Sequence, residues 1–150
     1  MDSLKTGNTQ SMITSRLDHY SIRTTKLDET RRFYVEIMSL VDGDRPPFNF
    51  PGAWLYSNGQ AVVHLVGIAP HDSSGLIDYL GAKGKAESSG TGTIDHVAFV
   101  CTGLSEMRGR LKSRAIQFRE RTVPDLNLHQ LFIEDPNGVT IELNYAASEI

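Results

Sequence analysis

The stretch that decides the fold is LDHYSIRTTKLDETRRFY at residues 17–34, because the chain repeats its pattern as IDHVAFVCTGLSEMRGRL at residues 94–111. The two stretches align without a gap at an offset of 77, which places His19 on His96. Few residues are identical, but both stretches alternate apolar and polar residues and then change to a helical spacing. This shared pattern indicates an internal duplication.

The ends of the two halves align as well, once the offset is increased to 78. AWLYSNGQAVVHLV at residues 53–66 then lies over LFIEDPNGVTIELN at residues 131–144. This alignment places His64 on Glu142, so each half carries one polar residue at the same point of its last apolar stretch.

Both halves predict the same order of elements. Residues 16–23 and 93–101 alternate apolar and polar side chains and are rich in β-branched and aromatic types, which predicts strands. Residues 28–39, with Asp28 as the expected N-cap, and residues 104–115 have apolar side chains at helical spacing. Three more strands are predicted in each half, near 41–48, 52–57, 60–67, 116–122, 127–134 and 139–145.

Each half is therefore expected to be a βαβββ module, and the chain an α+β protein of two modules. The first module spans residues 14–67 and the second spans residues 93–150. Residues 1–13 are expected to be a disordered tail. Residues 68–92 are rich in Gly and Ser, which is typical of a linker or a lid.

Composition limits the classes of function. With 39% hydrophobic and 22% charged residues, the chain resembles an ordinary globular protein. Its net charge of −3 gives no electrostatic reason to expect nucleic acid. A single cysteine, Cys101, excludes an internal disulfide and fits a reducing compartment. Since no apolar run is long enough for a membrane span or a signal peptide, we expect a cytoplasmic protein without a membrane partner.

Four polar residues stand in strands whose neighbours are apolar. His64 alternates with Val63 and Leu65, which point to the opposite face of their strand. Glu142 is flanked in the same way, and His19 and His96 lie near the start of each module's first strand. A buried carboxylate needs a compensating cation or hydrogen-bond donors.

The duplication relates these four positions in pairs, so we expect them to hold one divalent metal ion. Imidazole nitrogens and a carboxylate suit zinc, nickel, iron(II) or manganese. Four protein ligands in an octahedral shell leave two adjacent positions for two neighbouring oxygens of a substrate. The ion then acts as a Lewis acid on a developing enolate, or holds the substrate beside dioxygen. The expected metal ligands are His19, His64, His96 and Glu142.

Further site residues follow from the expected strand pairing. If Asp135–Gly138 is a four-residue turn, Leu131 pairs with Glu142 and His129 pairs with Asn144. His129 would then lie on the face of the site as a pocket wall or an acid–base group, whereas a one-residue slip would turn it away. Trp54, Tyr56 and Phe132 are candidates for an aromatic pocket wall that contacts substrate.

Together these motifs resemble the vicinal oxygen chelate superfamily, which includes glyoxalase I, extradiol dioxygenases, fosfomycin-resistance proteins and bleomycin-binding proteins. The resemblance covers nearly all of residues 16–145. It is carried by residues 18–40, VVHLV at 62–66, GTIDHVAFV at 92–100 and QLFIEDPNGVTIELNY at 130–145. It implies a glyoxalase/dioxygenase-like fold, in which paired βαβββ modules form a curled mixed β-sheet around a metal, often in a homodimer.

The resemblance also bears on the chemistry. The family's metal positions fall on His19, His64, His96 and Glu142, with Glu142 as proton shuttle, and a family arginine that meets an anionic part of the substrate falls on Arg23. Glyoxalase I has a glutamate at the position of His64, whereas His19, His96 and Glu142 are similar to the two-histidine, one-carboxylate set of the dioxygenases.

Several functions remain open at this stage. The first is a metal-dependent lyase, isomerase or dioxygenase whose small substrate chelates through two adjacent oxygens. The second is a metal-independent binding protein of the bleomycin-resistance type. The third is a metal-dependent thiol transferase that modifies an antibiotic. The sequence also leaves open whether one chain or two supply the metal ligands.

Overall fold

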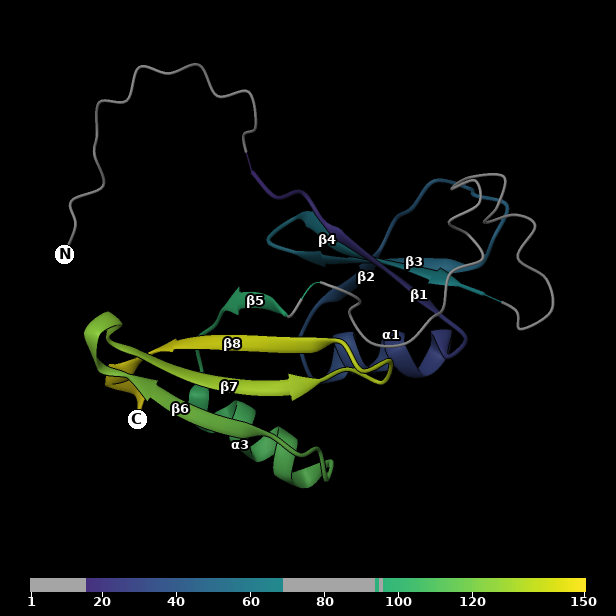
Figure 1. Ribbon diagram of the computed structural model, residues 1–150. Helices are drawn as coiled ribbons and strands as arrows, with labels where there is room; N and C mark the ends of the chain where they lie inside the picture. Colours follow the sequence, from purple (N-terminus) through teal and green to yellow (C-terminus); the bar gives the residue numbers. More distant parts are fainter. Residues whose placement is uncertain (1–15, 69–93, 95) are drawn as a thin grey trace, which may run out of the picture.

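The computed structural model describes residues 16–68, 94 and 96–150 (Figure 1). The predicted tail at residues 1–13 and nearly all of the predicted linker at residues 68–92 lie outside the described residues. In the described part of the chain, no helix is long and apolar enough to cross a membrane.

The first module forms a four-stranded mixed sheet in the order β1-β4-β3-β2. β1 runs parallel to β4, and the other neighbours are antiparallel. Its elements are β1 (Tyr20–Thr24), α1 (Leu27–Glu36), β2 (Val41–Gly43), β3 (Gly52–Ser57) and β4 (Gln60–Gly67).

The second module repeats this arrangement in the order β5-β8-β7-β6, again with its first and last strands parallel. Its elements are β5 (Val97–Val100), α3 (Leu104–Ser113), β6 (Arg119–Val123), β7 (Leu128–Glu134) and β8 (Thr140–Ala146), with short 3-10 helices at Pro124–Leu126 and Ala147–Glu149. The prediction of two βαβββ modules in an α+β protein is confirmed.

The strand registers confirm the duplication residue by residue. In the first sheet Ser21 pairs with His64, and in the second Ala98 pairs with Glu142. Ser21 and Ala98 are 77 residues apart, and His64 and Glu142 are 78 apart. These are the two offsets at which the halves of the sequence align.

Two local predictions are wrong. Asp28 is not the N-cap of α1, because the helix begins one residue earlier and Lys26 occupies the cap position without a side-chain hydrogen bond. Asp28 instead pairs with Arg31 at 2.8 Å. The strand predicted near 41–48 ends at Gly43, since Pro46 and Pro47 have no N–H for a neighbouring strand.

Both sheets contribute their helix-facing side chains to one hydrophobic core. Leu55, Val63 and Leu65 of the first sheet belong to the same buried cluster as Leu131 and Leu143 of the second. Figure 1 shows the two sheets at different levels, with α1 on the side of the β1–β4 sheet that faces the β5–β8 sheet. We call the face of each sheet that points away from this core its outer face.

A buried polar contact joins the modules at the turn between β7 and β8. The Tyr34 hydroxyl of α1 donates to Asp135 Oδ2 at 2.9 Å, and Asn137 Nδ2 donates to Thr30 Oγ1 at 3.0 Å. Asp135 Oδ1 also accepts the backbone N–H of Val139 at 2.9 Å. Since these groups are buried, the contacts fix how the second sheet lies against α1.

Candidate functional site

His19 and His64 lie against each other on the outer face of the first sheet. Their rings stack with centroids 3.6 Å apart and planes inclined by 11°. The other side of the His64 ring stacks on Trp54, 4.0 Å away. His64 points outward because Val63 and Leu65 on either side of it are buried in the core. We call His19 and His64 the N-terminal pair.

Hydrogen bonds and burial set the electrostatics of this pair. His19 Nδ1 lies 2.6 Å from Asp18 Oδ2, and this hydrogen bond lowers the pKa of the Asp18 carboxyl. When Nδ1 donates its proton to the carboxylate, the lone pair of His19 is on Nε2. Burial, and then the neighbouring His19 ring, lower the pKa of His64. A neutral imidazole is the form that binds a metal ion.

The parallel stack has a consequence for metal binding. The lone pair of an imidazole nitrogen lies in the plane of the ring, and two parallel rings 3.6 Å apart have no common plane. One of the two rings therefore has to rotate before both nitrogens bind the same ion. His64 Nε2 in addition lies 3.1 Å from the Ala61 carbonyl oxygen, a contact that such a rotation breaks.

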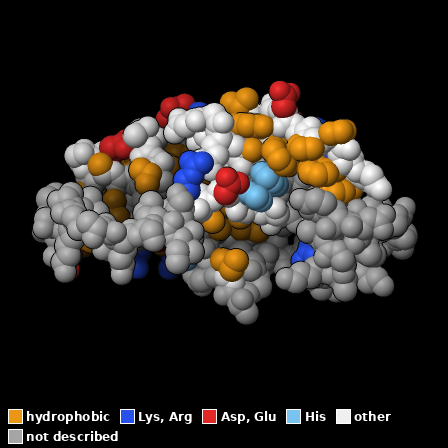
Figure 2. All heavy atoms as spheres, turned by 90° about the horizontal axis from the view of Figure 1, so that it is seen from above, with side chains coloured by type: hydrophobic (Ala, Val, Ile, Leu, Met, Phe, Trp, Pro, Cys, Tyr) orange, Lys and Arg blue, Asp and Glu red, His pale blue; other side chains and the backbone are white. Residues whose placement is uncertain are grey.

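An open pocket of ≈ 700 Å³ adjoins the N-terminal pair. Trp54, Tyr56 and Phe48 form its aromatic side, and Arg16 and Asp18 bring one charge of each sign. Figure 2 shows histidine side chains on this side of the molecule beside hydrophobic ones. Tyr56 is thus beside the N-terminal pair, and its hydroxyl donates to the Asp44 carbonyl oxygen at 2.6 Å.

His96 and Glu142, the C-terminal pair, take the equivalent place on the second sheet. His96 Nε2 lies 3.8 Å from Glu142 Oε1. This distance is shorter than two metal–ligand bonds of about 2.1 Å each, so His96 and Glu142 could hold a divalent ion together without a large movement. Asn144 Nδ2 donates to Glu142 Oε2 at 3.0 Å, and Gln130 donates to Asn144 Oδ1 at 2.9 Å. This chain of hydrogen bonds orients the carboxylate.

The structure does not bring the two pairs together within one chain. Among residues 16–68, 94 and 96–150, no three His, Cys, Asp or Glu side chains form a group that could hold a metal. The reason lies in the packing of the modules. Because both helix-facing sides share one core, the outer faces, which carry His64 and Glu142, point away from each other.

The two remaining predicted substrate contacts lie on different sheets. Arg23 in β1 pairs with Val66 in β4 and lies on the same outer face as His64. Phe132 pairs with Glu142 on the outer face of the second sheet, where the Arg119 guanidinium lies 4.7 Å from its ring centroid. Phe132 therefore belongs to the surroundings of the C-terminal pair and not to the pocket beside Trp54.

The predicted placement of His129 is wrong. The connection between β7 and β8 has one residue more than expected, so Phe132, not Leu131, pairs with Glu142. His129 then pairs with Tyr145, whose side chain is buried in the core. A slip of one residue turns a side chain to the other face of a sheet. His129 therefore lies on the face opposite Glu142 and is not a group of the site.

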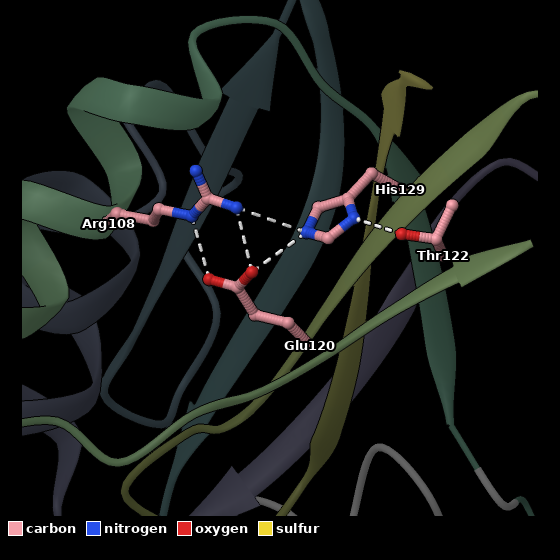
Figure 3. A network of polar contacts seen from close by, with 4 residues as sticks. All are labelled: Arg108, Glu120, Thr122 and His129. Atoms are coloured by element: carbon pink, nitrogen blue, oxygen red, sulfur yellow. Dashed lines mark hydrogen bonds and ion pairs between the residues drawn. The ribbon is translucent and has the colours of Figure 1, made fainter. Parts of the chain in front are cut away.

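His129 belongs instead to a polar network on the helix side of the second sheet (Figure 3). Its Nε2 lies 2.9 Å from Glu120 Oε2, and its Nδ1 lies 3.0 Å from the Thr122 hydroxyl. Arg108 of α3 donates two hydrogen bonds to Glu120, at 2.7 and 2.8 Å. The network fixes α3 against β6 and β7.

The Arg108 hydrogen bonds are the main cause that lowers the pKa of Glu120 to about 2, and His129 adds to the effect. A carboxyl whose pKa is lower in the folded protein stabilises it above its ordinary pKa, and this contribution is lost as the pH falls through the folded value. Glu120 therefore stabilises the fold fully above about pH 4.5. Its contribution fades between pH 4.5 and 2.

We predict that Glu120→Gln lowers the free energy of unfolding at pH 7 by about 1–2 kcal/mol, after discounting for solvent screening of a partly exposed group. At pH 3 the difference from the unsubstituted protein is expected to be clearly smaller. Urea unfolding at pH 7, 5 and 3 measures it. Glu106→Gln is the matched control, because Glu106 also pairs with an arginine of α3, Arg110, but does so on the surface of that helix. A difference for Glu120→Gln that does not change with pH would contradict the prediction.

Sequence reasoning did not single out two residues that support the site. Asp18 orients His19, and the Asp-His sequence at residues 18–19 and again at 95–96 was the signal that could have found it. Gln130 acts through Asn144 on Glu142. No sequence pattern indicates Gln130, since its place on the outer face follows from the register of β7.

Comparison with known proteins now places the chain in a family. The model of the Glyoxalase/Bleomycin resistance protein/Dioxygenase superfamily matches residues 16–143. The chain belongs to this superfamily. This confirms the resemblance to the superfamily. A curated relative, Glyoxylase I 4 of Arabidopsis thaliana, is 27% identical over 130 residues, which are 85% of this chain and 68% of the relative.

Solved structures of the superfamily share the fold. A putative glyoxalase family protein from Bacillus anthracis has a TM-score of 0.65 at 18% identity, covering 88% of this chain and 95% of that one. A lactoylglutathione lyase from Agrobacterium tumefaciens has a TM-score of 0.59 at 17% identity, covering 89% and 96%. A genomically encoded fosfomycin resistance protein from Listeria monocytogenes has a TM-score of 0.62 at 15% identity, covering 90% and 96%. At these identities the likeness shows the fold alone.

Proposed function

We propose that this protein is a divalent-metal-dependent enzyme that acts on a small molecule bound through two adjacent oxygens, as a lyase or isomerase or as an extradiol-type dioxygenase. We further propose that it works as a homodimer. Each metal site would join the N-terminal pair of one subunit to the C-terminal pair of the other. The protein would act in the cytoplasm.

The observation that carries this proposal is the equivalence of the two pairs. In β1, Ser21 pairs with His64, and His19 stands two residues before Ser21. In β5, Ala98 pairs with Glu142, and His96 stands two residues before Ala98. Both pairs lie on outer faces, away from the shared core. Three imidazoles and one carboxylate are a donor set for a borderline divalent ion. Core packing requires none of these four side chains.

The need for a second chain follows from the same geometry. Within one chain the shared core separates the outer faces, so the two pairs would meet only when the outer face of one subunit's first sheet covers the outer face of another's second sheet. In a dimer with twofold symmetry this contact occurs twice and gives two equivalent sites.

The residues of the chain would divide the chemistry among themselves. A bound divalent ion supplies Lewis acidity to the substrate oxygens. Glu142 is the single carboxylate of the set and would move a proton at its Oε1, while Asn144 holds Oε2. Arg23, on the same face as His64, would bind an anionic part of the substrate. Tyr56 and Phe132 would contact the substrate from the two sheets.

Elemental analysis tests the metal requirement directly. Protein purified without chelators is expected to carry about one divalent ion per chain. After chelation, iron(II), nickel, manganese and zinc are added back in turn. Calorimetry measures the binding of each ion, and turnover is assayed with small molecules that carry two adjacent oxygen atoms. If none of the four ions binds tightly, the proposal of a metal-dependent enzyme is wrong.

One observation favours a second function. The rings of His19, His64 and Trp54 are stacked, and this stack has to be broken before both histidines bind one ion. A protein that binds a small molecule without metal, as in the bleomycin-resistance branch of the superfamily, would keep this stack. In that case the chelated protein would bind its ligand as tightly as the untreated protein.

A further inference from the structure

The seam between the two modules contains a cavity on the helix side of the sheets. Its volume is ≈ 300 Å³, and its walls come from both modules. Met38 and Leu40 follow α1 in the first module, whereas Phe99, Met107 and Tyr145 belong to the second. All five residues are part of the shared core or pack directly against it. We call this space the seam cavity.

The seam cavity is separate from the two donor pairs. Phe99 pairs with Leu143 in the second sheet, and the Leu143 side chain is buried in the core. Phe99 therefore points to the helix side, while its neighbour Ala98, which pairs with Glu142, points to the outer face. A molecule in the seam cavity would thus lie on the opposite face of the second sheet from Glu142.

One polar group at the seam cavity lacks a partner. Tyr145 is 1% exposed, and its hydroxyl oxygen has no hydrogen-bond partner among the residues that the structure describes. The neighbouring Cys101 thiol donates to the Phe99 carbonyl oxygen at 3.7 Å, and a thiol sulfur is only a weak acceptor. Burial, and then Cys101, raise the pKa of Tyr145, so the hydroxyl keeps its proton at pH 7. A buried donor without an acceptor is costly, and an acceptor oxygen of a ligand removes that cost.

Hydrogen bonds across the seam fix the walls of the cavity. Arg110 of α3 donates to the Ile37 carbonyl oxygen at 2.9 Å and to Ser39 Oγ at 2.7 Å, and both acceptors belong to the first module. Arg110 Nη2 also pairs with Glu106 at 2.9 Å, so the two charges at the mouth of the cavity compensate each other. The cavity is therefore formed in advance of binding, and its mouth gives no net attraction for an ion.

We infer that the seam cavity is a binding site for a small neutral molecule that has an apolar body and one acceptor oxygen, such as a ketone. Met38, Phe99 and Met107 would contact the apolar body, and the Tyr145 hydroxyl would donate to the oxygen. A volume of ≈ 300 Å³ is at the lower end of the range for ligand pockets, which limits the molecule to the size of a fragment. The inference goes beyond the proposed function, because it uses none of the residues assigned to the metal or its substrate.

Acetophenone and α-methylstyrene test the role of Tyr145. The two molecules have nearly the same shape, but acetophenone has a carbonyl oxygen where α-methylstyrene has a methylene group. Tyr145→Phe keeps the ring and removes the hydroxyl, so it is expected to lower the ratio of acetophenone affinity to α-methylstyrene affinity about threefold to tenfold. Tyr20→Phe is the matched control, because Tyr20 also has a buried hydroxyl but lies in β1 outside the cavity. No change of the ratio is expected for it.

Methionine methyl groups report where acetophenone binds. The chain has four methionines, so ¹³C labelling of their methyl groups gives four signals in the full-length protein. The signals of Met38 and Met107, assigned with Met38→Leu and Met107→Leu, are expected to shift with saturation. Bound acetophenone is also expected to slow the reaction of Cys101, the single cysteine, with a disulfide reagent. Unchanged methionine signals in the absence of acetophenone confirm that each tyrosine variant is folded.

The charge and the metal state complete the test. Benzoate has a similar size but a negative charge and is expected to bind at least tenfold more weakly than acetophenone. If acetophenone moves neither methionine signal, if benzoate binds equally well, or if the two tyrosine variants change the affinity ratio equally, the inference is wrong.

The titrations are carried out on chelated and on zinc-loaded protein, and equal acetophenone affinity is expected in both. Acetophenone binding in a protein that takes up none of the four ions would refute the metal-dependent function and support the seam cavity. Metal uptake in a protein that does not bind acetophenone would refute the seam cavity alone.

Discussion

Replacement of His96 by alanine is expected to yield a folded protein that has neither the divalent ion nor the activity proposed above. His96 Nε2 lies 3.8 Å from Glu142 Oε1, and it would be the single nitrogen ligand that the C-terminal pair supplies. Without it the Glu142 carboxylate would be the single donor left in this pair. We expect metal affinity to fall by a factor on the order of 100 or more, since even residues that only support a ligand contribute a factor of about 10–100.

Calorimetric titration of chelated protein with each ion measures this loss, and thermal unfolding checks the fold. His129→Gln is the matched control, because it removes a histidine from the opposite face of the same sheet. The control is expected to lose stability but to retain its metal. Stoichiometric tight metal in the His96→Ala protein would remove His96 from the ligand set.

Mixing two inactive variants is expected to restore part of the activity if two subunits build each site. His64→Ala destroys the N-terminal pair, and Glu142→Ala destroys the C-terminal pair. In a mixed dimer, one site then combines both defects, while the other joins two intact pairs. Random exchange of subunits gives half mixed dimers, so metal content and activity are expected to recover to about one quarter of the unsubstituted level.

The variants are mixed after partial unfolding and refolding, so that subunits exchange. His64→Ala mixed with itself is the control and is expected to stay inactive. The doubly substituted chain mixed with the unsubstituted one gives a further check, because its mixed dimers have two sites with one intact pair each and no complete site. If the first mixture does not recover although the subunits are shown to exchange, two subunits do not build each site. The ligand set then either lies within one chain or is wrong.

Much of the site could be predicted from the sequence because it depends on alternation along single strands. Val63 and Leu65 are apolar and buried, so His64 must point outward, and Ile141 and Leu143 determine the direction of Glu142 in the same way. The offsets of 77 and 78 between the halves reappear in the pairing of Ser21 with His64 and of Ala98 with Glu142. Local patterns therefore predicted both pairs.

His129 shows where such reasoning fails. Its direction depends on the number of residues in the connection after Glu134, and the hydrogen bond from Asp135 N to the Val139 carbonyl oxygen lengthens that connection by one. The period of a strand is two residues, so this single residue turned His129 from the outer face to the helix side. Glu120 and Arg108, which hold it there, stand 9 and 21 residues before it, outside the alternation of its own strand.

The sequence by itself determined the two modules, the strands within them and the donor at each repeated position, because these follow from short-range periodicity and from the duplication. Only the tertiary structure decided how the two donor pairs lie relative to each other. Apolar faces of both sheets pack into one core, and the contact of Tyr34 with Asp135 fixes that packing. This long-range burial turns the two outer faces apart, and no local pattern in the chain contains that information.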